Sequence, residues 1–187
     1  MRKLILATTA LLSGLLLQPV CAAERPLLAA GSSIAFTFKQ MNVPVEGRFK
    51  KFSGKINLDA AKPETSSLDM QVDVASISAS EDADPEAVKP AWLDAAGHPQ
   101  ARFVSKAIKS LGGGHYQATG TLSIKGVSRD IVVPFDFKEQ AGGATADGQF
   151  TLKRGDYKVG EGEWSAFDIV ANDVLVKFHL ALGAAKP

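Results

Sequence analysis

Three histidines, His98, His115 and His179, are the side chains of this sequence best suited to general acid–base chemistry. A hydrolytic triad would need one of them beside an acid and a Ser or Cys nucleophile. His98 precedes a proline in a stretch without strand pattern, and His115 follows three glycines, so both are expected in loops or turns. His179 stands between two apolar residues of a strand pattern and is expected on its outer face. The sequence therefore favours structural roles for all three.

Metal and phosphate sites also lack a signature. The histidines are spread singly and the single cysteine is Cys21, whereas a zinc site needs three or four N, S or O ligands. The acids from Glu81 to Glu86 lack the alternating ligands and closing glutamate of a calcium loop. Gly112 to Gly114 lead into a strand pattern rather than a helix, unlike a phosphate-binding loop. No acid pair of a glycosidase stands out, and we predict no enzyme, no metal and no cofactor.

Apolar and polar residues alternate with a period of two through most of the chain, which predicts antiparallel strands. The segments number eight, at about residues 34–40, 45–59, 66–77, 101–110, 115–125, 128–138, 145–154 and 173–182. A closed sheet of eight strands has an interior that side chains fill or that holds one small ligand. We predict an all-β fold, an extended eight-stranded antiparallel barrel of lipocalin-like form.

Three local features interrupt this alternation. The inward parity changes across Lys50-Lys51, which predicts a bulge that bends the strand. Lys125-Gly126 predicts a hairpin turn. The connection 78–100 holds clustered acids and three prolines, which exclude a long helix or a central strand. Its apolar residues around Trp92 predict a short helical segment that covers one mouth of the barrel.

The inward face is the remaining candidate for function. It comprises Phe36, Phe38, Met70, Val72, Phe103, Tyr116, Leu122, Phe135, Phe150, Val176 and Phe178, with Trp92 and Trp164 expected near the ends of the interior. These side chains either fill a solid core or line a tunnel. Small inward residues favour the tunnel, since they are expected to leave volume unfilled: Gly54, Ala118, Gly120, Ala146 and Gly148. Such a tunnel favours an apolar guest, because each buried methylene contributes about 0.8 kcal/mol.

The first residues predict export. Arg2 and Lys3 precede an apolar run from Leu4 to Leu17, and small residues at 21–23 suit cleavage after Ala23. This makes residues 1–23 a signal peptide and 24–187 a single domain; a lipid anchor on Cys21 is the alternative. Without the leader, Lys plus Arg falls from 21 to 19 against 20 acids. A net charge of −1, with the lysines scattered among acids, predicts no nucleic-acid partner.

Several short motifs, in this order, carry a resemblance to a known family. They are Ser33-Ile34-Ala35-Phe36, Val45-Glu46-Gly47-Arg48-Phe49, Ser66 to Asp73, Trp92-Leu93-Asp94 with His98 to Phe103, Gly120 to Val127, and Arg154-Gly155-Asp156-Tyr157 with Gly160. Across the length from residue 24 onward the chain resembles the YceI family of exported bacterial lipid-binding proteins. Relatives often carry histidine where Gln40 stands and glycine where Asn42 stands. Asparagine tolerates the same left-handed backbone as glycine.

The resemblance implies a periplasmic carrier whose barrel encloses the apolar tail of a polyisoprenoid, isoprenoid quinone or similar amphiphile. The partner is then a long-chain apolar small molecule, with transient contact to a membrane or a membrane quinone protein; homodimer formation stays open. Two alternatives also stay open: a hydrolase of an exported amphiphile that uses His98 or His179, and a filled barrel that serves as an accessory subunit of a membrane electron-transfer protein. Arg154 and Asp156 are expected to form a charge pair that pins the glycine-rich segment after the seventh strand.

Overall fold

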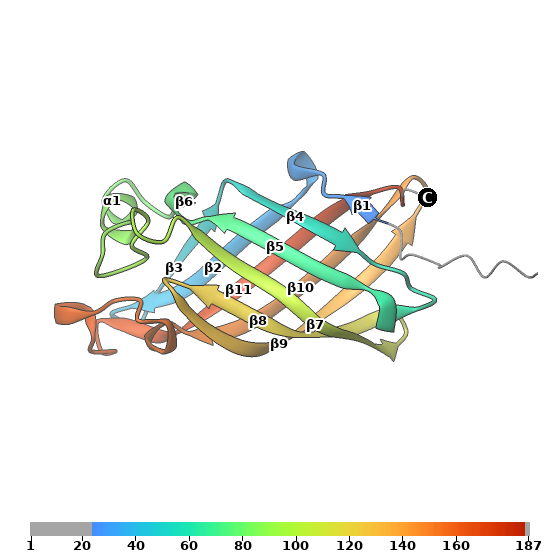
Figure 1. Cartoon of the computed structure of the whole chain (residues 1–187). Coiled ribbons are helices and arrows are strands. Elements are labelled where there is room, and N and C mark those ends of the chain that lie inside the picture. The colour runs from blue at the N-terminus through green and yellow to red at the C-terminus, as the bar shows by residue number, and fades with distance from the viewer. Residues whose placement is uncertain (1–23, 186–187) are drawn as a thin grey trace, which may run out of the picture.

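Residues 24–185 are described by a computed structural model and form one curled antiparallel sheet (Figure 1). Its strands are β1 (Glu24–Pro26), β2 (Ser33–Gln40), β3 (Val43–Phe49), β4 (Phe52–Asn57), β5 (Ser67–Asp73), β6 (Ile77–Ser78), β7 (Gln100–Gly112), β8 (His115–Ile124), β9 (Val127–Gln140), β10 (Gly143–Lys153) and β11 (Val170–Gly183). The α-helix is α1 (Ala83–Ala87), and the 3-10 turns are η1 (Ala29–Gly31), η2 (Pro63–Thr65), η3 (Val74–Ser76), η4 (Arg154–Tyr157) and η5 (Gly162–Trp164). The all-β prediction is confirmed, and so is a short helix in the 78–100 connection. The helix lies at Ala83–Ala87, however, whereas the residues around Trp92, where it was expected, form turns.

The strand pairings run in a ring. β2 pairs with β3, β3 with β6, β4 with β5, β5 with β7, and each later strand with the next until β11 returns to β2. Because β3 with β4 and β5 with β6 are broken halves of two longer strands, the ring has the eight members that the alternation predicts. The short β1 is an addition. It pairs with β4, and the following residue, Leu27, bridges to Leu182 of β11.

The break in the second long strand lies at the predicted place, Lys50-Lys51, but the extra residues belong to its neighbour. Phe49 pairs with Ile77 and Phe52 with Val72, so two residues face the four of 73–76. The backbone N–H of Lys50 donates to the Ser76 carbonyl at 3.0 Å. The prediction of a bulge in the 45–59 strand was therefore wrong about which strand is longer, and the bend comes from η3.

Tight turns match the sequence expectations. Lys125 and Gly126 have φ of 48° and 72° between the paired Ile124 and Val127, which confirms the hairpin. Asn42 has φ of 63°, the left-handed conformation that asparagine tolerates.

The barrel interior is packed at one end. Tyr116 stacks on Phe135 with ring centroids 5.5 Å apart and meets the edge of Phe137 at 6.0 Å. The packed cluster comprises Ile56, Leu58, Ile108, Tyr116, Ala118, Phe135, Phe137, Ala144, Ala146, Leu180 and Leu182. At the opposite end, in Figure 1, lie α1 and the segment that joins β10 to β11. The two ends thus differ, one closed by side chains and the other covered by connections.

Within residues 24–185, no helix is long and apolar enough to cross a membrane. The predicted signal peptide and the alternative anchor at Cys21 lie outside the described residues.

Candidate ligand-binding site

Two cavities lie along the inside of the barrel. The larger, the mouth cavity, has a volume of about 430 Å³, and the smaller, the inner cavity, about 160 Å³. Ile124 and Leu152 line both of them. Small-molecule sites usually occupy about 300–1,000 Å³, so the mouth cavity alone has the size of a ligand site. Because the two cavities share these wall residues, the inner cavity continues the mouth cavity toward the packed end of the barrel.

Twelve of the thirteen predicted site residues line one of these cavities. The mouth cavity takes Phe36, Phe38, Trp92 and Trp164, and the inner cavity takes Met70, Val72, Phe103, Leu122, Phe135, Phe150, Val176 and Phe178. Tyr116 lines neither cavity, and its ring packs against Phe135 and Phe137. Phe135 belongs to the same packed cluster but also lines the inner cavity, so the cluster borders that cavity. The interior is therefore filled at one end and hollow at the other, and both interpretations of the inward face hold for part of the barrel.

Sequence reasoning missed part of the wall. Ile124 and Leu152 continue the inward parity of Leu122 and Phe150, so their alternation carried a usable signal. The connections contribute residues for which periodicity gives no signal, namely Asp82, Asp84, Glu86, Leu93, Arg154 and Val159, and Gln40 adds an amide from the end of β2.

The inward glycines do not leave the empty volume expected of them. A Cβ on Gly148 would lie 2.4 Å from the Phe178 ring, and one on Gly54 would lie 2.2 Å from the Met70 sulfur. Each pair sits opposite across neighbouring strands. The glycines thus let large side chains lie close along the barrel wall. The larger hollow, the mouth cavity, arises instead where the barrel ends and the two connections arch over it.

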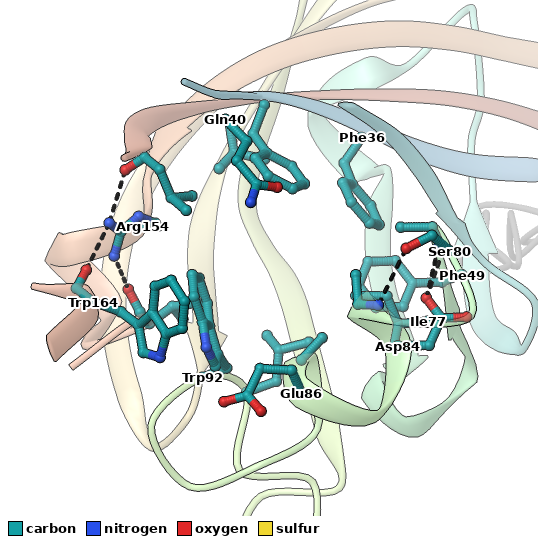
Figure 2. A pocket seen from close by; sticks show the side chains of 18 of the residues that line it. Phe36, Gln40, Phe49, Ile77, Ser80, Asp84, Glu86, Trp92, Arg154 and Trp164 are labelled. Carbon is teal, nitrogen blue, oxygen red and sulfur yellow. Dashed lines mark hydrogen bonds between the residues drawn. The ribbon is translucent and has the colours of Figure 1, made fainter. Parts of the chain in front are cut away.

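Arg154 organises the connection that forms one wall of the mouth cavity. It is 2% exposed, and its guanidinium donates to six main-chain carbonyls. These acceptors are Val159, Gly160, Trp164, Ala166, Val170 and Ala171, at 2.8 to 3.2 Å. The guanidinium also lies 5.4 Å from the Trp92 ring centroid and 5.0 Å from that of Phe167. Figure 2 shows Arg154 at the edge of the cavity beside Trp164.

The expected charge pair between Arg154 and Asp156 is wrong. Asp156 is exposed, and all hydrogen bonds of the guanidinium go to carbonyls. A guanidinium has five N–H donors, so six acceptors leave none free for a ligand. Burial lowers the pKa of Arg154 from its usual range, because desolvation disfavours the charged form. Arg154 pins the glycine-rich segment as predicted, but it does so by binding main-chain carbonyls of that segment and not by a charge pair.

The two connections meet at the mouth. The carbonyl of Ala91 accepts from the backbone N–H groups of Gly160 and Glu161, both at 2.8 Å. The Trp92 and Trp164 rings pack with centroids 5.5 Å apart. Gly160 has φ of 79°, and a Cβ there would lie 2.1 Å from the Arg154 guanidinium, so only glycine fits. These contacts fix one wall of the mouth cavity.

Acidic side chains form the opposite part of the rim. The Asp84 carboxylate accepts from the backbone N–H groups of Ala79 and Ser80 at 2.6 and 3.2 Å, as Figure 2 shows, and thereby fixes the turn before α1. Glu86 pairs with Lys89. Asp82 also lines the cavity. The mouth is therefore acidic, whereas the inner cavity is lined almost entirely by apolar side chains.

The three histidines lie outside both cavities. His115 bonds to Asp136, and His179 bonds to Asp147 across neighbouring strands, while His98 sits beside Asp94. None is placed to act on a molecule in the barrel. Within residues 24–185, no group of three or more His, Cys, Asp or Glu residues is arranged to hold a metal ion.

A closed antiparallel barrel with an apolar hollow defines a lipocalin-like protein. The model of the YceI-like domain matches residues 27–182, and the chain belongs to the YceI family. UPF0312 proteins of Pseudomonas syringae pv. tomato and Pseudomonas savastanoi are 34% identical over 122 residues, 62% of this chain. The chain spans 64% of the length of these curated relatives.

Solved structures share the fold. BcnA of Burkholderia cenocepacia is 41% identical with a TM-score of 0.81, covering 83% of this chain and 98% of that one. The YceI protein of Campylobacter jejuni is 25% identical with a TM-score of 0.64, covering 76% and 85%. A polyisoprenoid binding domain from Saccharophagus degradans is 18% identical with a TM-score of 0.69, covering 87% and 99%. This last likeness concerns the fold.

Proposed function

We propose that this protein binds a long apolar molecule, a polyisoprenoid, isoprenoid quinone or similar amphiphile, and carries it without covalent chemistry. The observation that carries the proposal is the pair of cavities with shared walls at Ile124 and Leu152. The ligand tail enters the inner cavity and the head group stays among the polar residues of the mouth. A protein of the same fold from Saccharophagus degradans is described as a polyisoprenoid binding domain, which supports this ligand class.

The position of the histidines favours a carrier over a hydrolase. A general base must come within hydrogen-bond reach of the proton that it removes, and His98 and His179 lie outside the cavities. The hollow end, in turn, favours ligand binding over a fully filled accessory subunit. Replacement of both histidines by alanine should leave ligand uptake unchanged; loss of an activity on an amphiphile in that variant would revive the hydrolase.

The carrier is further proposed to work in the periplasm and to touch a membrane transiently while it loads. Support comes from exposed apolar residues beside the mouth, namely Met41, Val43, Phe167 and Ile169. The Met41 N–H donates to the Ile169 carbonyl at 2.7 Å. The turn between β2 and β3 and the end of the connection before β11 therefore form one surface. Their neighbours Gln40 and Val170 line the mouth cavity, so the exposed apolar surface borders the mouth, which supports the proposed membrane contact.

Vesicle flotation tests this contact. The chain with Met41→Ser and Phe167→Ser should float less with phospholipid vesicles than the unchanged chain, and equal flotation would refute the membrane contact.

Equilibrium binding tests the carrier itself. A fluorescent apolar probe is loaded into the purified protein, and a prenol or an isoprenoid quinone is titrated in. Displacement of the probe in a one-to-one ratio supports the proposal. Absence of both probe binding and displacement, in a protein that melts cooperatively, would refute it.

A further inference from the structure

The mouth cavity has a polar rim with an unequal balance of charge. Three carboxylates line it, those of Asp82, Asp84 and Glu86, against a single cation, Arg154. Among the ion pairs of residues 24–185, Glu86 has the partner Lys89, whereas Asp82 and Asp84 have none. Two carboxylates without a cationic partner, one of them held by two backbone N–H groups, therefore stand where the head group of a bound amphiphile would lie.

The cation of the cavity cannot offset a negative head group. All five N–H donors of Arg154 are used by carbonyls, and the guanidinium is 2% exposed. To bind a phosphate, it would have to give up contacts that hold the wall of the cavity. The rim also holds the Gln40 amide, which is neutral and exposed.

We infer that the mouth selects ligands by head-group charge: it accepts a neutral head group, such as a hydroxyl or a quinone carbonyl, and rejects a phosphate or diphosphate. This inference rests on the proposed function and names the ligand class of the same site. A hydroxyl can donate to the carboxylates of the rim, and a carbonyl can accept from the Gln40 amide. A phosphate offers mainly acceptors and meets carboxylates that also only accept.

The expected discrimination is large enough to measure. A phosphate about 8 Å from one rim carboxylate is repelled by about 2 kcal/mol near a protein surface. Since about 1.4 kcal/mol corresponds to tenfold in Kd, this repulsion weakens binding at least about tenfold. The test compares a prenol of about 20 carbons with its monophosphate, each displacing the same fluorescent probe at pH 7 and low salt. The prenol should bind at least about tenfold more tightly, and added salt should narrow the difference.

Neutral isosteres then assign the effect to the rim. The triple variant Asp82→Asn, Asp84→Asn, Glu86→Gln removes the three charges but keeps one oxygen on each side chain, so that residue 84 can still accept from Ala79 and Ser80. It should reduce the preference for the prenol to about threefold or less. A control variant removes three exposed acids outside the cavity lining, with Glu64→Gln, Glu81→Gln and Asp173→Asn, and should keep the full preference.

Each outcome separates this inference from the proposed function. Equal affinity of the unchanged chain for prenol and phosphate would overturn the charge selection while leaving the carrier in place. An unchanged preference in the triple variant, or the same loss in the control variant, would also overturn it. Failure of both ligands to displace the probe would instead refute the carrier.

Discussion

Leu152 stands where the mouth cavity continues into the inner cavity, and its replacement by tryptophan tests whether a ligand uses both. Leu152 and Ile124 line both cavities. A tryptophan at 152 carries a much larger side chain on the same inward face and should obstruct the passage. The mouth cavity should remain open, because most of its wall comes from the connections around Trp92 and Arg154.

The size of the effect follows from the inner volume. The inner cavity of about 160 Å³ holds about five carbon-sized groups, if each takes about 30 Å³ as a water does. At about 0.8 kcal/mol for each buried methylene, these carbons contribute at most about 4 kcal/mol. This limit corresponds to about a thousandfold in Kd. We therefore expect Leu152→Trp to weaken a chain of about 20 carbons by about 100- to 1,000-fold, and a chain about five carbons shorter by about threefold or less.

Probe displacement with a series of prenols of increasing length measures this difference. Val132→Trp is the matched control, since Val132 is 51% exposed on the outer parity of β9, and it should leave the whole series unchanged. Thermal melts establish that both variants fold. Equal weakening of short and long chains by Leu152→Trp, or no weakening of the long chain, would refute the reasoning that the tail passes into the inner cavity.

Three further predictions concern the scaffold. Arg154→Met leaves six carbonyls without their donor and should lower the free energy of unfolding by about 3 kcal/mol or more; Asp156→Asn should change it by less than about 0.5 kcal/mol in the same denaturant titration, and equal effects would contradict the carbonyl network. Gly148→Ala places a Cβ 2.6 Å from the Pro134 carbonyl oxygen and should cost about 1–3 kcal/mol in that assay; an unchanged midpoint would refute the close packing. Lys125, by its hydrogen bond, lowers the pKa of Glu161 below its ordinary 4.5, so this contact stabilises the fold above that pH and is lost as the pH falls toward the folded pKa. The melting temperature of Glu161→Gln should accordingly lie below that of the unchanged chain at pH 7 and meet it at about pH 3, and a gap that persists in acid would contradict the assignment.

The sheet could be predicted from the sequence because each strand has one apolar and one polar face. The segments at 34–40 and 101–110, for example, correspond to β2 and β7. The parity change at Lys50-Lys51 also carried real information. What it could not show was that the extra residues lie in the neighbouring strand, where Asp73 accepts from Ala75 and turns the chain into η3. Such a capped turn has no periodicity.

The candidate site also has a part that could be predicted from the sequence and a part that could not. Residues such as Phe103 and Phe178 could be assigned to the interior by parity, which tells the face of a strand. Parity does not tell the depth along the barrel axis, and for that reason Tyr116 was grouped with them although it lies in the packed end. At the mouth, Trp92 and Trp164 could be predicted, but the polar residues of its walls could not, because those walls are irregular connections. The partners of Arg154 are main-chain carbonyls, which leave no mark in the residue types.

The central claim is that the hollow half of the barrel holds an apolar chain. The most direct measurement is organic extraction of the full chain, purified without detergent from its natural host, followed by mass spectrometry of the extract. The account predicts a long-chain prenol, quinone or related neutral amphiphile in near one-to-one ratio to protein, and less of it from Leu152→Trp. Repeated recovery of folded protein free of any lipid, together with failure to take up a prenol or quinone afterwards, would contradict it.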